Sequence, residues 1–270
     1  MIGVVIPVHN EEALLAHCLA SIIAASHAEA LADEPVQIVV VLDACTDRSA
    51  AIARSFGIET LALRARNVGM ARAAGARHLL DNGARWLAFT DADSRVSAGW
   101  LAAQLALGAD AVCGSICVDD WSGHPQHVRD YFRQTYVDAD GHQHVHGANL
   151  GVAATAYERA GGFAPLACSE DVALVERLVE TGARVAWSAA PRVVTSARGA
   201  SRARGGFGDT LSGWAARLDR APEARQTRES LQPFEAVETA RVIETMDTVD
   251  TIDTLSAAQE REGRLRTEPS

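Results

Sequence analysis

In the segment Trp86-Leu-Ala-Phe-Thr-Asp-Ala-Asp-Ser-Arg95, a short apolar run leads directly into two carboxylates, Asp91 and Asp93. The run from 86 to 89 predicts a buried strand. Two like charges one residue apart repel each other, and neither can be buried unpaired at an acceptable cost in free energy. A hard divalent cation such as Mg²⁺ or Mn²⁺, which prefers oxygen ligands, would relieve that repulsion. The alternative is a solvated loop with two ordinary aspartates.

Strands and helices alternate on both sides of this segment. The predicted strands cover residues 4–8, 36–42, 58–63, 86–89 and 111–118. The predicted helices follow Asn10 as N-cap, follow Asp43 as far as Gly57, and cover residues 70–80, 97–107 and 170–180, with Ser169 as the cap of the last. Four strand–helix alternations in the first 110 residues predict an α/β fold with a mostly parallel central sheet, helices on both faces and right-handed crossovers.

Three of the predicted strands end in polar or acidic residues: Asn10 with Glu11, then Asp43, then Asp91 with Asp93. The carboxyl ends of parallel strands meet at one edge of a sheet, and open α/β sheets bind their ligands there. The pattern therefore indicates one shared site, which favours the metal interpretation of Asp91 and Asp93 over the loop.

The composition excludes several kinds of chemistry. All 25 basic residues are arginine, so there is no lysine for a Schiff base, a pyridoxal phosphate anchor or a Walker A phosphate loop. The net charge of −10 disfavours nucleic-acid binding. An anionic ligand would need local arginines, helix N-termini or a metal.

Several features predict a cytoplasmic protein without a transmembrane segment. No run of 18 apolar residues occurs, and the first seven residues resemble a strand more than a signal peptide. The cysteines are odd in number and scattered, which favours a reducing compartment. Two of them, Cys113 and Cys117, are also weak candidates for metal ligands.

The regions after residue 118 are less regular. Residues 119–145 gather aromatic and histidine side chains and suggest a segment that binds the acceptor of a reaction, although His142, His144 and His146 on one strand face would also allow a zinc site. From residue 222 onward, 6 arginines and 11 acids give a charge of 6 − 11 = −5. We expect a globular domain over residues 1–218 and a flexible acidic tail over 219–270, with a short amphipathic piece near 210–218.

The sequence resembles the family 2 glycosyltransferases of the GT-A fold over roughly residues 1–200. Four segments in family order carry the resemblance: Val4-Val-Ile-Pro-Val-His-Asn-Glu11, Val39-Val-Val-Leu-Asp43, Asp91-Ala-Asp93, and a late block with His146-Gly-Ala-Asn149, Gly161-Gly-Phe163 and Glu170-Asp171. Each segment alone is a weak signal, but four in order are specific. The resemblance implies an inverting enzyme that moves a sugar from a UDP- or GDP-sugar to a hydroxyl acceptor.

The resemblance also implies roles for individual residues. The nucleotide would be bound by Pro7, His9, Glu11, Asp43, Arg72, Asp91 and Ala92; the divalent metal, Mg²⁺ or Mn²⁺, by Asp93; the acceptor or donor sugar by His146, Gly147, Asn149 and Glu170; and Asp171 would be the catalytic base. In this scheme Asp43 contacts the base, Asp91 the ribose and Arg72 a phosphate. Asp171 would lie in the first turn of a helix, where the dipole favours its ionised form by about 0.3–1 kcal/mol.

The chain also departs from the family pattern. His9 stands where many relatives have tyrosine, and residues 193–198 lack the histidine that completes the metal shell in some members. Arg198, Arg202 and Arg204 would then contact the diphosphate, or the dependence on metal would be weaker. The donor sugar, the acceptor and the oligomeric state stay open.

Three other functions are considered. A phosphatase with an Asp-x-Asp motif normally carries it on the first strand and needs a later lysine. This chain has the motif on a later strand and contains no lysine, which argues against a phosphatase. A nucleotidyltransferase would have a glycine-rich first loop, where this chain has Pro7-Val-His-Asn10. A sugar-nucleotide-binding protein of the same fold without turnover is the alternative that the motifs leave open.

Overall fold

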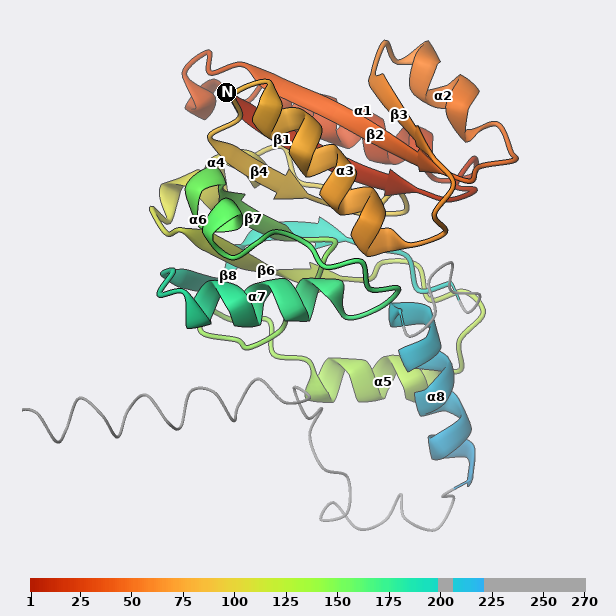
Figure 1. Cartoon of the computed structure of the whole chain (residues 1–270). Coiled ribbons are helices and arrows are strands. Elements are labelled where there is room, and N and C mark those ends of the chain that lie inside the picture. Colours follow the sequence, from red (N-terminus) through yellow and green to blue (C-terminus); the bar gives the residue numbers. More distant parts are fainter. Residues whose placement is uncertain (199–205, 221–270) are drawn as a thin grey trace, which may run out of the picture. The chain divides into compact units, whose positions relative to one another are not determined.

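The computed structural model describes residues 1–198 and 206–220 (Figure 1). The strands are β1 (Ile2–Val8), β2 (Val36–Asp43), β3 (Glu59–Leu63), β4 (Trp86–Phe89), β5 (Arg95–Val96), β6 (Ala111–Cys117), β7 (Leu150–Ala153) and β8 (Val185–Val194). The helices are α1 (Leu15–Ser26), the 3-10 helix η1 (Glu29–Leu31), α2 (Ser49–Ser55), α3 (Val68–Asp81), α4 (Trp100–Ala106), α5 (Gln126–Thr135), α6 (Ala154–Arg159), α7 (Glu170–Glu180) and α8 (Phe207–Arg220).

All eight strands form one sheet in the order β3-β2-β1-β4-β7-β6-β8-β5. The pairs β3–β2, β2–β1, β1–β4 and β6–β8 are parallel, whereas β7 is antiparallel to both β4 and β6 and β5 is antiparallel to β8. The predicted α/β fold with a mostly parallel sheet is therefore confirmed. The reversed direction of β7 was not predicted, because a four-residue strand carries no information on its direction.

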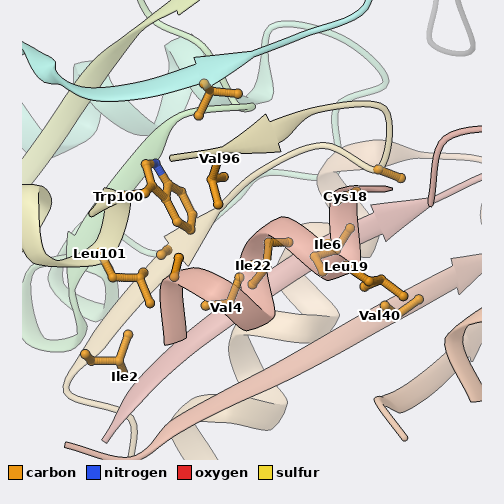
Figure 2. Packing of buried hydrophobic residues seen from close by; sticks show 14 of the residues in the cluster. Ile2, Val4, Ile6, Cys18, Leu19, Ile22, Val40, Val96, Trp100 and Leu101 are labelled. Atoms are coloured by element: carbon orange, nitrogen blue, oxygen red, sulfur yellow. The ribbon is translucent and has the colours of Figure 1, made fainter. Parts of the chain in front are cut away.

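The core lies on both faces of the sheet, because alternate residues of a strand point to opposite faces. In β1, Val4 and Ile6 join the cluster that includes residues of α1 and α4, and Val5 joins the cluster that includes residues of α3, α6 and α7. Figure 2 shows the first cluster, with Val4, Ile6 and Trp100 among its labelled side chains. Each fully buried aliphatic side chain stabilises the fold by about 1.5–3 kcal/mol.

The helix after β1 begins later than predicted. Asn10 does not cap it: this residue has a φ of 56°, and its Oδ1 accepts a hydrogen bond from Thr46 N. The helix α1 starts only at Leu15, with no acidic residue in its first turn. Asparagine tolerates the left-handed conformation better than most residues, so here it turns the chain instead of starting a helix.

The other predicted helix starts agree more closely. Asn67 caps α3 through its side chain, which accepts a hydrogen bond from Met70 N at 2.9 Å. The helix α7 covers residues 170–180 as predicted, but Ser169 has a φ of 57° and makes no side-chain capping bond. In α3, Gly75 permits a close approach to the sheet, since a Cβ there would lie 2.5 Å from Val5 Cγ1.

The irregular region after β6 contains α5, which packs against α8. A small apolar cluster of Val128, Ala197 and Leu211 joins them, and His127 Nε2 lies 3.2 Å from Asp219 Oδ1. The expected boundary after residue 218 thus falls inside α8, and almost all of the expected tail lies outside the described residues. Within residues 1–198 and 206–220, the helices are too short or too polar to cross a membrane.

Candidate functional site

Four acidic side chains lie where β1, β2 and β4 end side by side. β1 lies between β2 and β4 in parallel register, so Glu11, Asp43, Asp91 and Asp93 follow the same edge of the sheet. This is the edge that the sequence predicts. Two arginines from distant parts of the chain contact three of these acids.

Arg72 joins Asp91 to Glu170. Its Nη2 donates to Asp91 Oδ1 at 2.5 Å, and its Nη1 donates to Glu170 Oε1. The Arg72 side chain is 4% exposed, and the guanidinium lies 5.8 Å from the ring centre of Phe163. The late acidic pair is thereby held at the end of β4, although 79 residues of sequence separate Asp91 from Glu170 (170 − 91). These contacts use two of the five N–H donors of Arg72, so contact with a phosphate, as predicted, would use the others.

Arg198 joins Asp93 to Glu11. Its Nη1 donates to Glu11 Oε2 at 2.6 Å, its Nη2 donates to Glu11 Oε1, and Nη2 also lies 3.1 Å from Asp93 Oδ2. Burial, followed by the nearby charge of Asp91, raises the pKa of Asp93 to about 7, and the charge of Arg198 opposes that rise. Glu11, predicted to line the nucleotide pocket, is buried beneath this ion pair.

Asp171 lies in the first turn of α7, directly after Glu170. Its Oδ2 accepts a hydrogen bond from Gly147 N at 2.7 Å, and its Oδ1 accepts one from Val172 N at 2.9 Å. Each carboxylate oxygen has two lone pairs, so these bonds orient the group and leave it capacity to accept a proton. Asp171 is half-buried, and two backbone N–H groups fix the direction of its carboxylate.

Asp43, predicted to contact the nucleotide base, binds backbone N–H groups of its own chain. Its Oδ1 accepts hydrogen bonds from Ala65 N and Arg66 N, its Oδ2 accepts one from Asn67 N, and the side chain is buried. The carboxylate therefore holds the connection from β3 to α3. Contact with a nucleotide base would use the one lone pair that these bonds leave on Oδ2.

Asn149 was predicted to contact a sugar, and the structure places it in the core instead. Its Nδ2 donates to Ser115 O and Pro191 O, each at 2.7 Å, and its Oδ1 accepts from Trp100 Nε1 at 2.8 Å. The residue is fully buried, and both of its N–H donors are used. Its role is to join β6, β8 and α4, so it is removed from the candidate sugar contacts.

The remaining predicted residues surround the acidic edge. His9 Nδ1 donates to Asp43 O at 2.6 Å, next to Pro7 near the end of β1. Ala92 packs in the core between the two aspartates, so only its backbone can face a ligand. Gly147 lies against Arg72, where a Cβ would come within 2.4 Å of Nη2.

His142, His144 and His146 are not on a strand, although their rings do lie in succession. The ring centres of His142 and His144 are 5.4 Å apart, and those of His144 and His146 are 6.0 Å apart. Tyr136 stacks on His144 at 4.3 Å, and its hydroxyl lies 3.1 Å from His146 Nε2. These contacts make an aromatic stack and give no support to the zinc alternative.

Two hydroxyl residues were not anticipated from the sequence. Ser94 Oγ lies 3.2 Å from Asp93 Oδ1 and 2.9 Å from Thr195 Oγ1, which ties the segment before Arg198 to the end of β4. The only available signal was the position of Ser94 directly after the acidic pair. Arg202 and Arg204, suggested as further diphosphate contacts, lie outside the described residues.

Both carboxylates of the Asp91-Ala-Asp93 segment are paired with arginines in this structure. Nowhere in the described ranges do three His, Cys, Asp or Glu side chains group so that they could hold a metal ion. Asp91 Oδ1 is engaged by Arg72, and the guanidinium of Arg198 lies against Asp93 Oδ2. A divalent cation at Asp93 would therefore lie beside the guanidinium of Arg198 and would take its other ligands from substrate phosphates and water, as Mg²⁺ commonly does in proteins.

Comparison with known proteins identifies the family. The model of glycosyl transferase family 2 matches residues 3–158, which is more than half of the chain. The chain belongs to glycosyl transferase family 2. The match includes β1, β2 and the Asp91-Ala-Asp93 segment, whereas Glu170, Asp171 and Arg198 lie beyond it. No curated protein matches this chain.

Solved structures with a similar fold are also glycosyltransferases. A mannosyltransferase from Pyrobaculum calidifontis in complex with GDP-Man and Mn²⁺ is 19% identical, with a TM-score of 0.58 over 99% of this chain and 76% of that one. TarS residues 1–349 from S. aureus in complex with UDP-GlcNAc is 16% identical, with a TM-score of 0.55 over 80% of this chain and 65% of that one. Glucosyl-3-phosphoglycerate synthase from Mycobacterium tuberculosis, with Mn²⁺, UDP-Glc and phosphoglyceric acid, is 18% identical, with a TM-score of 0.51 over 73% and 72%.

These likenesses establish that the chain has the GT-A fold. At such low identity they carry no information on its donor, acceptor or metal. The chain spans 37% of a longer TarS chain and 65% of TarS residues 1–349.

Proposed function

We propose that this glycosyltransferase moves a sugar from a UDP- or GDP-sugar to a hydroxyl group of an acceptor, with inversion at the anomeric carbon. The observation that carries the proposal is the contact of Arg72 with both Asp91 and Glu170. It brings the late acidic pair to the strand ends where open α/β sheets bind nucleotides. The donors named for the similar structures, GDP-Man, UDP-GlcNAc and UDP-Glc, are of the class proposed.

The proposed reaction is a direct displacement with Asp171 as the base. The acceptor oxygen forms a bond to the anomeric carbon while the bond from that carbon to the diphosphate oxygen breaks. The hydroxyl proton passes to the Asp171 carboxylate, and the electron pair of the broken bond leaves with the nucleoside diphosphate. The two backbone N–H groups that hold Asp171 support this role, because they fix the direction in which the carboxylate faces.

The nucleotide is proposed to lie along the edge formed by Pro7, His9, Asp43 and Asp91, with the sugars nearer to His146, Gly147 and Glu170. The binding of Mg²⁺ or Mn²⁺ by Asp93 stays a prediction. Mn²⁺ in two of the similar structures keeps a divalent cation as one source of positive charge at the diphosphate.

A reducing, cytoplasmic location is also proposed. All five cysteine thiols are free, including the exposed Cys168. Proteins of oxidising compartments more commonly pair their cysteines.

The proposal can be tested with Asp171→Asn and Asp81→Asn as a matched pair. Asp81 is an exposed aspartate at the C-terminal end of α3, the end opposite to the strand-end site. Binding of UDP, GDP and their sugars is measured by calorimetry with and without Mn²⁺, and donor turnover is followed by release of the nucleoside diphosphate. Loss of the base should lower turnover by about 10²–10⁴-fold in Asp171→Asn and leave nucleotide affinity unchanged.

Undiminished turnover in Asp171→Asn would contradict the assignment of the base. A wild-type protein that binds no nucleotide under either condition would contradict the function as a whole. Binding of a nucleotide sugar without any turnover in the wild type would favour the non-catalytic alternative. Asp81→Asn should behave as wild type throughout.

A further inference from the structure

We infer that Arg198 binds the diphosphate of the donor and supplies the positive charge that lets nucleotide bind without a divalent cation. The inference rests on the proposed function. It starts from the positive charge that lies against Asp93, the residue predicted to bind the metal. The Arg198 guanidinium lies 3.1 Å from Asp93 Oδ2, where a divalent cation bound to this carboxylate would otherwise lie.

Arg198 is anchored at the acidic edge by its contact with Glu11. Two guanidinium nitrogens contact the two oxygens of this one carboxylate, and the Glu11 side chain is 6% exposed. Such a bidentate pair fixes the plane of the guanidinium as well as its position. Glu11 thereby acts as the support of Arg198, which explains why an acid in the predicted nucleotide pocket is buried.

The backbone that carries Arg198 is also held in place. Thr195 N donates to Cys117 O at 2.9 Å, and the Thr195 hydroxyl lies within hydrogen-bonding distance of Ser94. Ala197 is buried in the cluster between α5 and α8, and His124 Nε2 donates to the Ala197 carbonyl. These contacts fix the backbone before Arg198 and so help to position its guanidinium beside Asp93.

Arginine has the chemistry that a diphosphate requires. A guanidinium has five N–H donors, of which the contacts with Glu11 and Asp93 use three, and it matches phosphate oxygens in a fork geometry. The side chain is 27% exposed, so it can meet a ligand while Glu11 stays covered. In a chain without lysine, arginine is the only side chain that carries a permanent positive charge.

The inference predicts that metal dependence reverses when Arg198 is replaced. Wild-type protein should bind UDP or GDP in EDTA with an affinity within about threefold of that in Mn²⁺. Arg198→Ala should bind about 10- to 100-fold more weakly in EDTA, as expected for loss of a charge-assisted contact. Added Mn²⁺ should restore much of that loss, because Asp93 is then open to a cation. Both affinities are measured by calorimetry.

Two further variants separate binding from folding. Arg198→Lys keeps the charge but loses the bidentate contact, and it should show an intermediate affinity in EDTA. The matched control is Arg85→Ala. Arg85 also donates two hydrogen bonds to one carboxylate, that of Glu34, but it lies directly before the start of β4, at the end of the strand opposite to the site. Arg85→Ala should leave nucleotide affinity unchanged. Rescue by Mn²⁺ distinguishes a lost ligand contact from a folding defect, since Mn²⁺ would not repair a misfolded protein.

Three results would overturn the inference without contradicting the proposed function. One is wild-type protein that binds nucleotide in Mn²⁺ but not in EDTA, which would leave the proposed function intact and assign the charge to the metal. Another is Arg198→Ala with unchanged affinity in EDTA. The third is weakened binding in Arg198→Ala that Mn²⁺ does not restore while Arg198→Lys binds no better. Absence of nucleotide binding in both conditions would overturn the proposed function together with the inference.

Discussion

At the scale of single residues, carboxylates that look alike in the sequence have different environments. Asp43 accepts three backbone N–H groups and is buried, whereas Asp171 accepts two and stays half-buried. Asp93 contacts Arg198, and burial, followed by the charge of Asp91, raises the pKa of Asp93. A structural carboxylate differs from one that can take part in chemistry in the number of its hydrogen-bond partners and in its exposure to solvent. Its position in a motif says less.

Asp43→Asn should destabilise the protein. An amide offers a single acceptor oxygen, so its NH₂ group would face a backbone N–H that the carboxylate now accepts. We expect the free energy of unfolding to fall by about 1–3 kcal/mol, the usual cost of leaving a buried polar group unsatisfied. Urea unfolding followed by circular dichroism measures this change. Asp81→Asn, at an exposed surface ion pair, should change it little, and equal midpoints for the two variants would disprove the role of Asp43.

At the scale of elements, the aromatic stack in the segment between α5 and β7 favours the neutral form of its histidines. Its members are Tyr136, His142, His144 and His146. His142 Nδ1 accepts from His144 N, and His144 Nε2 accepts from Val137 N, so a proton on either nitrogen would oppose an N–H donor. Burial, followed by the charge of His142, lowers the pKa of His144 to about 4. Burial, followed by the neighbouring imidazoles, lowers the pKa of His146 to about 3.

These lowered pKa values predict acid sensitivity. Between about pH 4 and 6.5 the unfolded chain binds more protons than the folded one, so the histidines' contribution to stability rises with pH and is complete above pH 6.5. Asp93, with a pKa raised to about 7, contributes with the opposite sign. His144→Phe keeps a ring in the stack but does not titrate. The difference in unfolding free energy between wild type and this variant should therefore shift in favour of the wild type from pH 4.5 to 7. If the difference in unfolding free energy between the two proteins did not change with pH, the lowered pKa of His144 would be contradicted.

At the scale of the whole molecule, Asn149 joins the two parts of the sheet. The parallel strands β3-β2-β1-β4 meet β6 and β8 through the antiparallel β7, and Asn149 lies at the start of β7. Its amide contacts the carbonyls of Ser115 and Pro191 and the indole of Trp100. Gly114 has no side chain at this point, and a Cβ there would lie 2.2 Å from Asn149 Nδ2.

Asn149→Ala should be among the most destabilising substitutions in the chain. It would leave two carbonyls and one indole N–H without their buried partner, and we expect a loss of about 3 kcal/mol or more in the free energy of unfolding. The exposed Asn82→Ala is the matched control and should change stability by about 0.5 kcal/mol or less. Thermal unfolding of both variants measures the difference. A loss in Asn149→Ala no greater than in Asn82→Ala would show that the joint does not depend on this amide.

Much of the fold could be predicted from the sequence because its signals are local. Apolar runs such as residues 36–42 predict strands, and their alternation with helices predicts a parallel sheet. The same reasoning predicted that the acidic residues at the ends of β1, β2 and β4 lie at one edge of the sheet. Helix starts were less predictable, as Asn10 illustrates, because a cap and a left-handed turn use the same residue type.

The sequence by itself determined the class of fold, the family and the edge of the sheet where the acids gather, since all of these follow from periodicity and from the order of motifs. Only the tertiary structure decided which partner each acid has. Arg72 reaches Asp91 and Glu170, Arg198 reaches Glu11 and Asp93, and Asn149 turns into the core. The reason is physical. A charge or an amide is stabilised by whatever lies within hydrogen-bonding distance, and residues separated by 187 positions, such as Glu11 and Arg198, come that close only when the chain has folded.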